Sequence, residues 1–207
     1  MTSAIFICSI LGYLAGSIPF GLVLTMASGL GDIRKIGSGN IGATNVLRTG
    51  RKDLALLTLI FDVAKAGFVA LLCRSLFHSE AMGLLAGTMA VIGHNFPIWL
   101  RFKGGKGVAS TLGLMLAMTP EAGILTCLTW LGMAMFKHYS SLSALTALAL
   151  APLYALVFNS STAALFYLAL TVLSFYRHRG NIQRLWNGTE TKIDLKKKVD
   201  KKKNNDE

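Results

Sequence analysis

Three polar segments carry the side chains that could do chemistry, and each places glycine beside hydroxyl, amide or basic groups. The first occupies residues 37–48 and reads Gly-Ser-Gly-Asn-Ile-Gly-Ala-Thr-Asn-Val-Leu-Arg. Closely spaced glycines let a backbone approach a ligand, and exposed N–H groups with hydroxyl and amide side chains can bind phosphate oxygens. This segment predicts a phosphate-binding loop. A flexible hydrophilic connector is the alternative.

The second segment occupies residues 102–107, reads Phe-Lys-Gly-Gly-Lys-Gly, and is followed by Ser110 and Thr111. It lies at the start of an apolar stretch that we expect to be helical. A helix N-terminus offers unpaired N–H donors and a positive partial charge, so glycines and lysines there form a natural phosphate cradle. The spacing differs from that of the nucleotide-binding P-loop, and we infer no nucleotide site. A plain basic flank of a membrane span is the alternative.

The third segment, residues 178–190, begins where the last apolar stretch ends. His178, Asn181, Arg184 and Leu185 recur at helical spacing, so one helix face could aim an imidazole, an amide and a guanidinium at a common point. An amphipathic helix lying beside the membrane fits the same pattern equally well.

These segments must be positioned by long apolar elements, which the composition predicts to be membrane-spanning helices. Of the 207 residues 53% are hydrophobic and only 15% are charged, against about 25% charged residues in a typical soluble chain. We expect an all-α, polytopic integral membrane protein with about seven spans. Their approximate bounds are Ala4–Met26, Leu54–Leu76, Ala81–Leu100, Val108–Met118, Glu121–Phe136, Leu142–Phe158 and Thr162–Tyr176. The fourth and fifth are short and could form one broken or re-entrant unit; Pro120 between them fits the start of a new helix.

The distribution of basic residues predicts the orientation. With seven spans, all Lys and Arg fall on one side except Arg74 on the other and Lys65 inside a span. Because basic loops stay in the cytoplasm, the N-terminus is expected outside and the C-terminus inside. Residues 1–192 would form the membrane domain, and residues 193–207 a lysine-rich tail typical of disordered segments that bind anionic lipid headgroups.

Charged and polar groups inside the spans have plausible structural roles. Asp62 and Lys65 lie three residues apart, so mutual pairing is the simplest expectation, with Arg48 or Lys103 as alternative partners of Asp62. His94 is expected to be a buried, hydrogen-bonded structural residue. The three cysteines show no metal-binding spacing, and the sequence contains no Gly-x-Ser-x-Gly nucleophile motif, so no metal and no covalent acyl-enzyme is expected.

At the three polar segments the sequence resembles the bacterial acyl-phosphate:glycerol-3-phosphate acyltransferase family, the PlsY type. The resemblance rests on residues 37–46, on residues 93–97 with 102–109, and on residues 178–185 with 188–190, and it extends from the first span to about Lys192. It implies an enzyme of phospholipid synthesis that moves a fatty acyl group from acyl phosphate to the sn-1 hydroxyl of glycerol 3-phosphate. The products would be lysophosphatidic acid and inorganic phosphate.

The resemblance also implies a site, a location and partners. The residues expected to matter most for catalysis are Ser38, Arg48, Lys106, His178 and Asn181. Those expected to bind substrate are Gly39, Asn40, Gly42, Thr44, Asn45, Lys103, Gly104, Gly105, Gly107, Ser110, Thr111, Arg184 and Glu190. The enzyme would need no cofactor or metal, would bind membrane lipids but no nucleic acid, and would face the cytoplasm from the bacterial inner membrane. Functional coupling to an enzyme that supplies acyl phosphate is expected.

The proton acceptor and two alternative functions stay open at this point. Either the departing phosphate oxygen or His178, whose reference pKa is about 6.5, could accept the hydroxyl proton. An anion transporter would also use basic loops, but it needs charge near the midplane and an accessible outer face, which here is nearly uncharged. A non-catalytic scaffold would account for the basic tail but not for three glycine- and asparagine-rich segments on one side.

Overall fold

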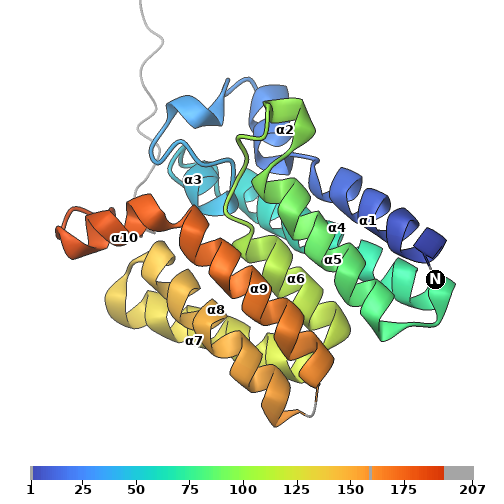
Figure 1. Ribbon diagram of the computed structural model, residues 1–207. Coiled ribbons are helices and arrows are strands. Elements are labelled where there is room, and N and C mark those ends of the chain that lie inside the picture. Colours follow the sequence, from blue (N-terminus) through green and yellow to red (C-terminus); the bar gives the residue numbers. More distant parts are fainter. Residues whose placement is uncertain (1, 159, 194–207) are drawn as a thin grey trace, which may run out of the picture.

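The computed structural model describes residues 2–158 and 160–193, and every regular element in them is helical (Figure 1). The α-helices are α1 (Thr2–Gly16), α2 (Phe20–Ala27), α3 (Ala43–Leu47), α4 (Lys52–Phe77), α5 (Glu80–Asn95), α6 (Val108–Met118), α7 (Pro120–Lys137), α8 (Ser140–Val157), α9 (Ser161–Arg177) and α10 (Arg179–Trp186). Two 3-10 turns, η1 (Ile33–Lys35) and η2 (Ile98–Leu100), lie in the connections. The lysine-rich residues 194–207 lie outside the described residues.

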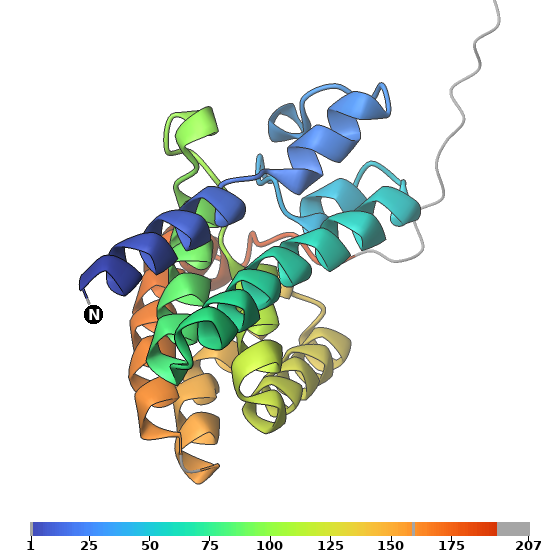
Figure 2. The same cartoon turned by 90° about the vertical axis from the view of Figure 1, so that its right-hand side faces the viewer.

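The first expected span is broken, because Pro19 divides it into α1 and α2. Proline cannot donate a backbone hydrogen bond, and its ring clashes with the preceding turn. Because the helix is interrupted here, the Ile18 carbonyl oxygen can accept a hydrogen bond from a side chain. The Lys65 ammonium donates to it at 2.9 Å. A short linker between the two helices is visible in Figure 2. The first expected span, residues 4–26, therefore consists of two helices separated by a break, and the whole segment Thr2–Ala27 is long and apolar enough to span a membrane.

The fourth and fifth expected spans are two separate helices, α6 and α7. Pro120 is the first residue of α7, as its position predicts. The 11 residues of α6 reach only about 16 Å, roughly half of a bilayer core about 30 Å thick. Four helical segments in the described part of the chain are long and apolar enough to span a membrane: Thr2–Ala27, Lys52–Phe77, Glu80–Leu100 and Ser140–Val157.

Small residues allow the helices to approach closely. A Cβ atom on Gly12 would lie 2.1 Å from the Ala86 carbonyl oxygen, and one on Gly16 would lie 1.9 Å from that of Ala90. Two glycines one turn apart therefore seat α1 directly on the backbone of α5, as small residues do in membrane helix pairs. Gly113 brings α6 equally close to α4, with the Val63 carbonyl oxygen 2.0 Å from its ideal Cβ position.

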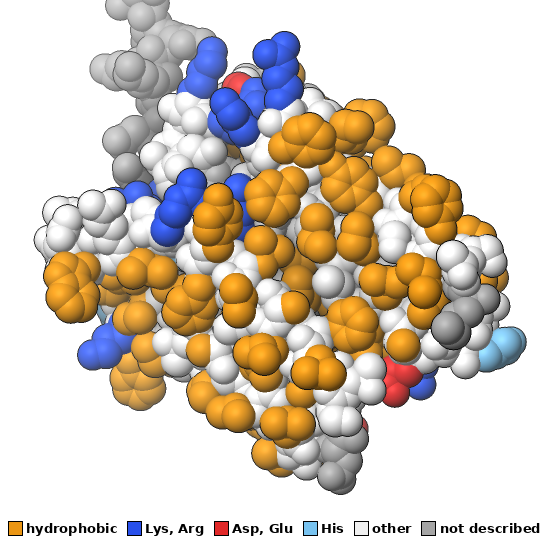
Figure 3. Space-filling model, viewed as in Figure 1, with side chains coloured by type: hydrophobic (Ala, Val, Ile, Leu, Met, Phe, Trp, Pro, Cys, Tyr) orange, Lys and Arg blue, Asp and Glu red, His pale blue; other side chains and the backbone are white. Residues whose placement is uncertain are grey.

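The surface is apolar around the helical body and basic at one end. Phe68, Leu165 and Val172 are 65–70% exposed, which fits side chains that face lipid. In Figure 3 hydrophobic side chains cover the helices of the visible face, while Lys and Arg gather near the connections that follow α2 and α5. The bundle thus carries its polar segments on a basic end above an apolar belt.

Candidate active site

Lys106 lies at the centre of the basic end, immediately before α6. Gly107 caps that helix with a φ of 79°, a left-handed conformation that glycine adopts without strain. Within the described residues, the amides of Val108, Ala109 and Ser110 have no hydrogen-bond acceptor, as expected for the first turn of a helix. The Lys106 ammonium therefore supplies positive charge, and the neighbouring backbone N–H groups supply hydrogen-bond donors.

A hydrogen-bonded network connects Lys106 to the C-terminal segment. The Lys106 ammonium donates to Asn181 Oδ1, and Asn181 Nδ2 donates to Glu190 Oε1 at 2.6 Å. The same carboxylate accepts from Ser141 Oγ at 2.7 Å and from Arg184 Nε at 2.8 Å. Glu190 thereby holds α10 against the start of α8 and fixes the rotamer of Asn181.

The charges around Lys106 are mostly positive. Burial is the main cause that lowers the pKa of Lys106, to about 8; Glu190 acts to raise it, while Arg184, Arg48 and Arg177 lower it further. Burial acts to raise the pKa of the Glu190 carboxyl, but hydrogen bonds from Ser141, Asn181 and Arg184 outweigh burial and hold that pKa below its ordinary value. One carboxylate is therefore surrounded by several cations, an arrangement suited to an additional anion.

His178 is neutral and has a defined tautomer. Its Nδ1 lies 2.8 Å from the Ser174 carbonyl oxygen, which can only accept, so the proton is on Nδ1 and the lone pair is on Nε2. Burial and then the Lys106 charge lower the pKa of the imidazole to about 4. The Nε2 atom can therefore accept a hydrogen bond throughout the physiological pH range.

The first polar segment is organised by Asn45, which is only 2% exposed. Asn45 Nδ2 donates to the carbonyls of Ile33, Ile36 and Asn40 at 2.8–3.0 Å, and its Oδ1 accepts from the Ser38 amide at 3.0 Å and hydroxyl at 3.2 Å. All of its polar groups are used inside the loop. Asn45 therefore shapes the loop that presents Ser38, and its contact with substrate stays a prediction.

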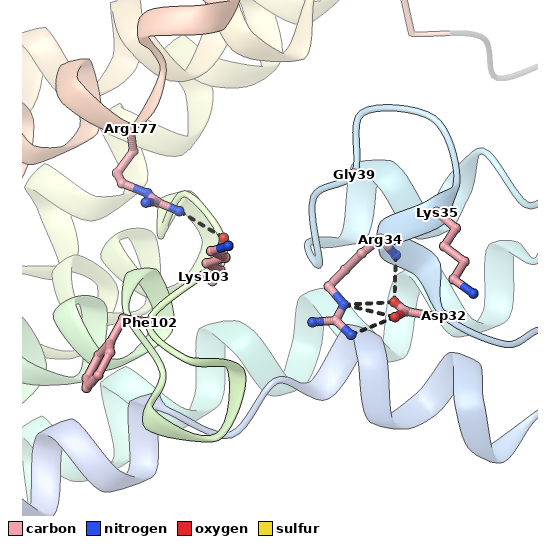
Figure 4. Close-up of a pocket in the computed structure, with 8 residues that line it drawn as sticks. Asp32, Arg34, Lys35, Gly39, Phe102, Lys103 and Arg177 are labelled. Carbon is pink, nitrogen blue, oxygen red and sulfur yellow. Dashed lines mark hydrogen bonds and ion pairs between the residues drawn. The ribbon is translucent and has the colours of Figure 1, made fainter.

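Arg48, at the end of the first segment, lies close enough to Lys106 for its charge to lower the pKa of that lysine. An ideal Cβ on Gly37 would lie 2.8 Å from Arg48 Cδ, so only glycine leaves room for this side chain. Beside it, a cleft of about 480 Å³ separates the first and second polar segments. The cleft is shown in Figure 4, and its lining is Asp32, Arg34, Lys35, Gly39, Phe102, Lys103, Gly104 and Arg177.

The glycines of the second segment are required for packing against the end of α5. The amides of Gly104 and Gly105 donate to the carbonyls of Asn95 and His94 at 3.2 and 3.0 Å. An ideal Cβ on Gly105 would lie 2.0 Å from His94 Nε2. Both N–H groups therefore already have acceptors within the protein, and the role of these two glycines in substrate binding stays a prediction. The N–H donors left available lie further along, at the start of α6.

Several other expected substrate contacts have local structural roles. The Thr111 hydroxyl donates to the Gly107 carbonyl at 2.8 Å, and the Thr44 hydroxyl lies 3.2 Å from Ser140 Oγ. Gly42 is the N-cap of α3. Ser110 is fully buried, and its hydroxyl has no partner among the described residues. Lys103 is exposed and lines the cleft with Gly39.

Arg177 is an organising residue that the sequence motifs did not reveal. Its guanidinium donates to the Gly104 carbonyl at 2.9 Å and to the Gly105 carbonyl at 2.9 and 3.1 Å, and it lies 5.0 Å from the centroid of the Phe96 ring. In the sequence, Arg177 looks like any other basic residue that flanks a span. Its position directly before His178 is the one feature that could have indicated a role in the site.

The expectations for groups inside the spans are confirmed. Lys65 Nζ lies 2.8 Å from Asp62 Oδ1, so the two residues pair with each other and not with Arg48 or Lys103. His94 is 4% exposed and is hydrogen-bonded through Nδ1 to Lys65 at 2.9 Å.

Comparison with known proteins identifies the family. The model of the glycerol-3-phosphate acyltransferase family matches residues 6–188. The chain belongs to this family. The glycerol-3-phosphate acyltransferase of Rhodospirillum rubrum is 56% identical over 200 residues, covering 93% of each chain. That of Paramagnetospirillum magneticum is 56% identical over 189 residues, covering 91% of this chain and 94% of the relative.

Solved structures of this glycerol-3-phosphate acyltransferase family share the fold. The crystal structure of PlsY, an integral membrane glycerol 3-phosphate acyltransferase, in its glycerol 3-phosphate form has a TM-score of 0.87 and 38% identity, covering 93% of this chain and 96% of the other. The lysophosphatidic acid form has a TM-score of 0.84 and 37% identity, covering 92% and 95%. The likeness to an integral membrane protein agrees with the apolar helical belt. Glu190, which anchors Asn181, lies just beyond the segment that the family model matches.

Proposed function

We propose that this protein transfers a fatty acyl group from acyl phosphate to the sn-1 hydroxyl of glycerol 3-phosphate, releasing lysophosphatidic acid and inorganic phosphate. The observation that carries the proposal is the group of cations around Lys106, to which Arg48 and Arg184 contribute, beside a neutral His178. Both substrates carry a phosphate, and one also carries a long apolar chain. A basic pocket at the end of an apolar helix bundle suits this pair.

The reaction is a single acyl transfer without a covalent enzyme intermediate. The sn-1 hydroxyl oxygen attacks the acyl carbonyl carbon, the bond from that carbon to the phosphate oxygen breaks, and the hydroxyl proton ends on the departing phosphate. Acyl phosphate is already activated, so correct placement and stabilisation of charge supply most of the acceleration.

The departing phosphate is the stronger of the two candidate bases. The departing group is inorganic phosphate, which is a stronger base than a phosphate monoester with its second pKa of about 6, whereas the pKa of His178 is about 4. His178 therefore orients the acceptor by accepting a hydrogen bond from its hydroxyl at Nε2. Lys106 and Arg48 bind and neutralise phosphate, and Asn181 keeps Lys106 aimed at the pocket. Ser38 and Arg184 supply the remaining polar side chains of the proposed substrate pocket.

The membrane arrangement we propose has seven spans, with the N-terminus outside and the active site at the cytoplasmic face of the bacterial inner membrane. Its support is the asymmetry of basic residues, since only Arg74 falls on the opposite side and Lys65 is buried within α4. In this arrangement α6 and α7 each count as one of the seven segments, although the helical part of α6 alone covers only about half of the bilayer core. Acyl phosphate would arrive through functional coupling to an enzyme that makes it.

Donor competition tests the proposed chemistry. Purified protein in detergent is given glycerol 3-phosphate with either palmitoyl phosphate or the palmitoyl thioester of coenzyme A, and the products are separated by mass spectrometry. Lysophosphatidate from acyl phosphate alone, acylated at the sn-1 position, is the expected result. Product from the thioester alone, or acylation at the sn-2 position, would contradict the proposal.

A further inference from the structure

A charged cluster lies inside the bundle, outside the pocket just described. The Lys65 ammonium contacts Asp62 Oδ1 at 2.8 Å, His94 Nδ1 at 2.9 Å and the Ile18 carbonyl oxygen at 2.9 Å. The contacts with His94 and Ile18 are hydrogen bonds, and the contact with Asp62 is an ion pair. The side chains of Lys65, Asp62 and His94 are only 2–4% exposed. We name these three residues the buried cluster.

The buried cluster joins three elements that are distant in sequence. Asp62 and Lys65 belong to α4, His94 lies in the last turn of α5, and Ile18 lies at the break between α1 and α2. Burying a lysine and an aspartate is expensive even when they pair, and an apolar replacement is often no less stable. The stability of the bundle alone therefore gives little reason for charge at this place.

His94 transmits the geometry of the cluster to the second polar segment. The Lys65 ammonium donates to Nδ1, which places the ring proton on Nε2 and fixes the ring orientation. Gly105 lies directly on this ring, since a Cβ there would lie 2.0 Å from Nε2. The Gly105 amide also donates to the His94 carbonyl at 3.0 Å. The position of the ring therefore limits where Gly105 can lie.

Gly105 is also held by Arg177, which donates to its carbonyl oxygen. The segment is therefore held by contacts with both the His94 ring and the Arg177 guanidinium. Lys106, the next residue, reaches Asn181. A shift of Gly105 thus changes the place from which Lys106 extends toward Asn181.

We propose that Asp62, Lys65 and His94 are positioning residues for Lys106, which act by fixing Gly105 and do not touch substrate. This inference rests on the proposed function, because it concerns the efficiency of that reaction. The charges at Asp62 and Lys65 orient the His94 ring, the ring supports Gly105, and Gly105 sets the direction of Lys106. The contact with Ile18 also ties this geometry to the break in the first span.

The test removes both charges together so that neither is left unpaired. The double variant Asp62→Asn with Lys65→Met is compared with wild type in detergent, by steady-state kinetics and thermal unfolding. We expect kcat/KM for glycerol 3-phosphate to fall about tenfold or more, as for misplaced catalytic groups. We also expect the alkaline limb of the kcat/KM profile to move above pH 8, because a released Lys106 is less buried. A purely structural role would leave that limb unchanged.

The matched control is Tyr167→Phe, which removes a buried 2.7 Å hydrogen bond to Thr119 at the other end of α6. It is expected to lower the unfolding temperature while kcat/KM and the alkaline limb stay as in wild type. A folded double variant with wild-type kcat/KM and an unchanged limb would overturn the inference.

A second variant applies if the double variant does not fold. His94→Gln keeps the Asp62–Lys65 pair and removes only the ring beneath Gly105, and the same two kinetic changes are expected from it. Unchanged kinetics in folded His94→Gln would overturn the inference equally. Wild-type activity is measured first: inactive wild type refutes the proposed function, whereas active wild type with unaffected variants refutes only the positioning role.

Discussion

Lys106 is the residue around which the charged groups of the site are gathered. Three arginines and one carboxylate act on its charge, and its ammonium is held by Asn181. The sequence predicted Lys106 to be part of a phosphate cradle, because its segment combines lysines with glycines directly before an apolar helix. It could not reveal the surroundings of Lys106, which come from segments more than fifty residues away in either direction.

The lowered pKa of Lys106 predicts an alkaline limit to activity. Deprotonation above about pH 8 removes the positive charge that attracts phosphate, so kcat/KM is expected to fall as the pH rises through that value. Bound phosphate stabilises the charged form, so kcat should fall only at higher pH. In Lys106→Arg the limb should move upward, because guanidinium stays charged. Initial rates from pH 5 to 10 provide the measurement, and a limb near pH 8 that persists in Lys106→Arg would contradict the assignment.

The lowered pKa of His178 predicts that its protonation does not limit activity near neutrality. The imidazole is neutral above about pH 4, so any acid limb near pH 6 should come from the substrate phosphate and appear unchanged in His178→Gln. That variant is expected to lose about a hundredfold in kcat, because the acceptor hydroxyl loses its orienting partner. The assignment fails if wild type shows an acid limb that His178→Gln abolishes.

Residues with structural roles were the hardest to assign from sequence. Asn45 and Gly105 stood inside the right motifs, yet their amide groups serve the loop and the end of α5. Motif membership indicates that a residue is needed, but not whether ligand or protein is its partner. Arg177 shows the reverse case, since a basic residue beside a span is expected from topology alone, and its contacts stay hidden in the sequence.

At the scale of elements, polar segments are fixed by the ends of helices. The sequence predicted most spans from apolar length and placed the start of α7 at Pro120. It missed the break at Pro19, because the apolar run continues through it and hydropathy does not register a lost backbone donor. It also left the relation of α6 to α7 open, which depends on tertiary packing.

Close packing of the second segment on α5 predicts that Gly105→Ala impairs both stability and activity. A methyl group would overlap His94 Nε2 at 2.0 Å, so the loop must shift, at an expected cost of about 1–3 kcal/mol in unfolding free energy. We expect a fall in kcat/KM as Lys106 moves with the loop. Gly132→Ala is the matched control, since its ideal Cβ meets nothing within 4 Å. It should be neutral or more stable by about 0.5–1 kcal/mol, with normal activity. Full activity in Gly105→Ala would contradict this account.

The attachment of α10 to α8 through Glu190 predicts a pH-dependent contribution to stability. Because the folded-state pKa of Glu190 lies below its ordinary value of 4.5, the contribution is present above that value and is lost as the pH falls through the folded-state pKa. Glu190→Gln should therefore lower the unfolding temperature at pH 7, and the difference from wild type should become smaller as the pH is lowered below 4.5 toward pH 3. It should also reduce activity, because Asn181 loses its acceptor. Thermal unfolding of both proteins across this range provides the measurement; an equal difference at both pH values would argue against the role.

For the whole molecule, the basic end and the apolar belt together define how it sits in a bilayer. The proposed orientation predicts opposite labelling of two exposed positions, Ser3 and Lys192, in a background whose three native cysteines are replaced. In intact spheroplasts a membrane-impermeant maleimide should modify Ser3→Cys but not Lys192→Cys, and lysis should expose the second. Modification of Lys192→Cys from outside would contradict the orientation and place the site on the wrong face for a cytoplasmic substrate.

The most direct test of the central claim is the dependence of phosphate release on both substrates. Purified wild-type protein in detergent is given palmitoyl phosphate and glycerol 3-phosphate, with each omitted in turn, and inorganic phosphate and lysophosphatidate are measured together. The account predicts equal amounts of the two products and release only when both substrates are present. Release from palmitoyl phosphate alone would indicate a phosphatase, and no release from folded protein would contradict the assignment of acyl transfer to this site.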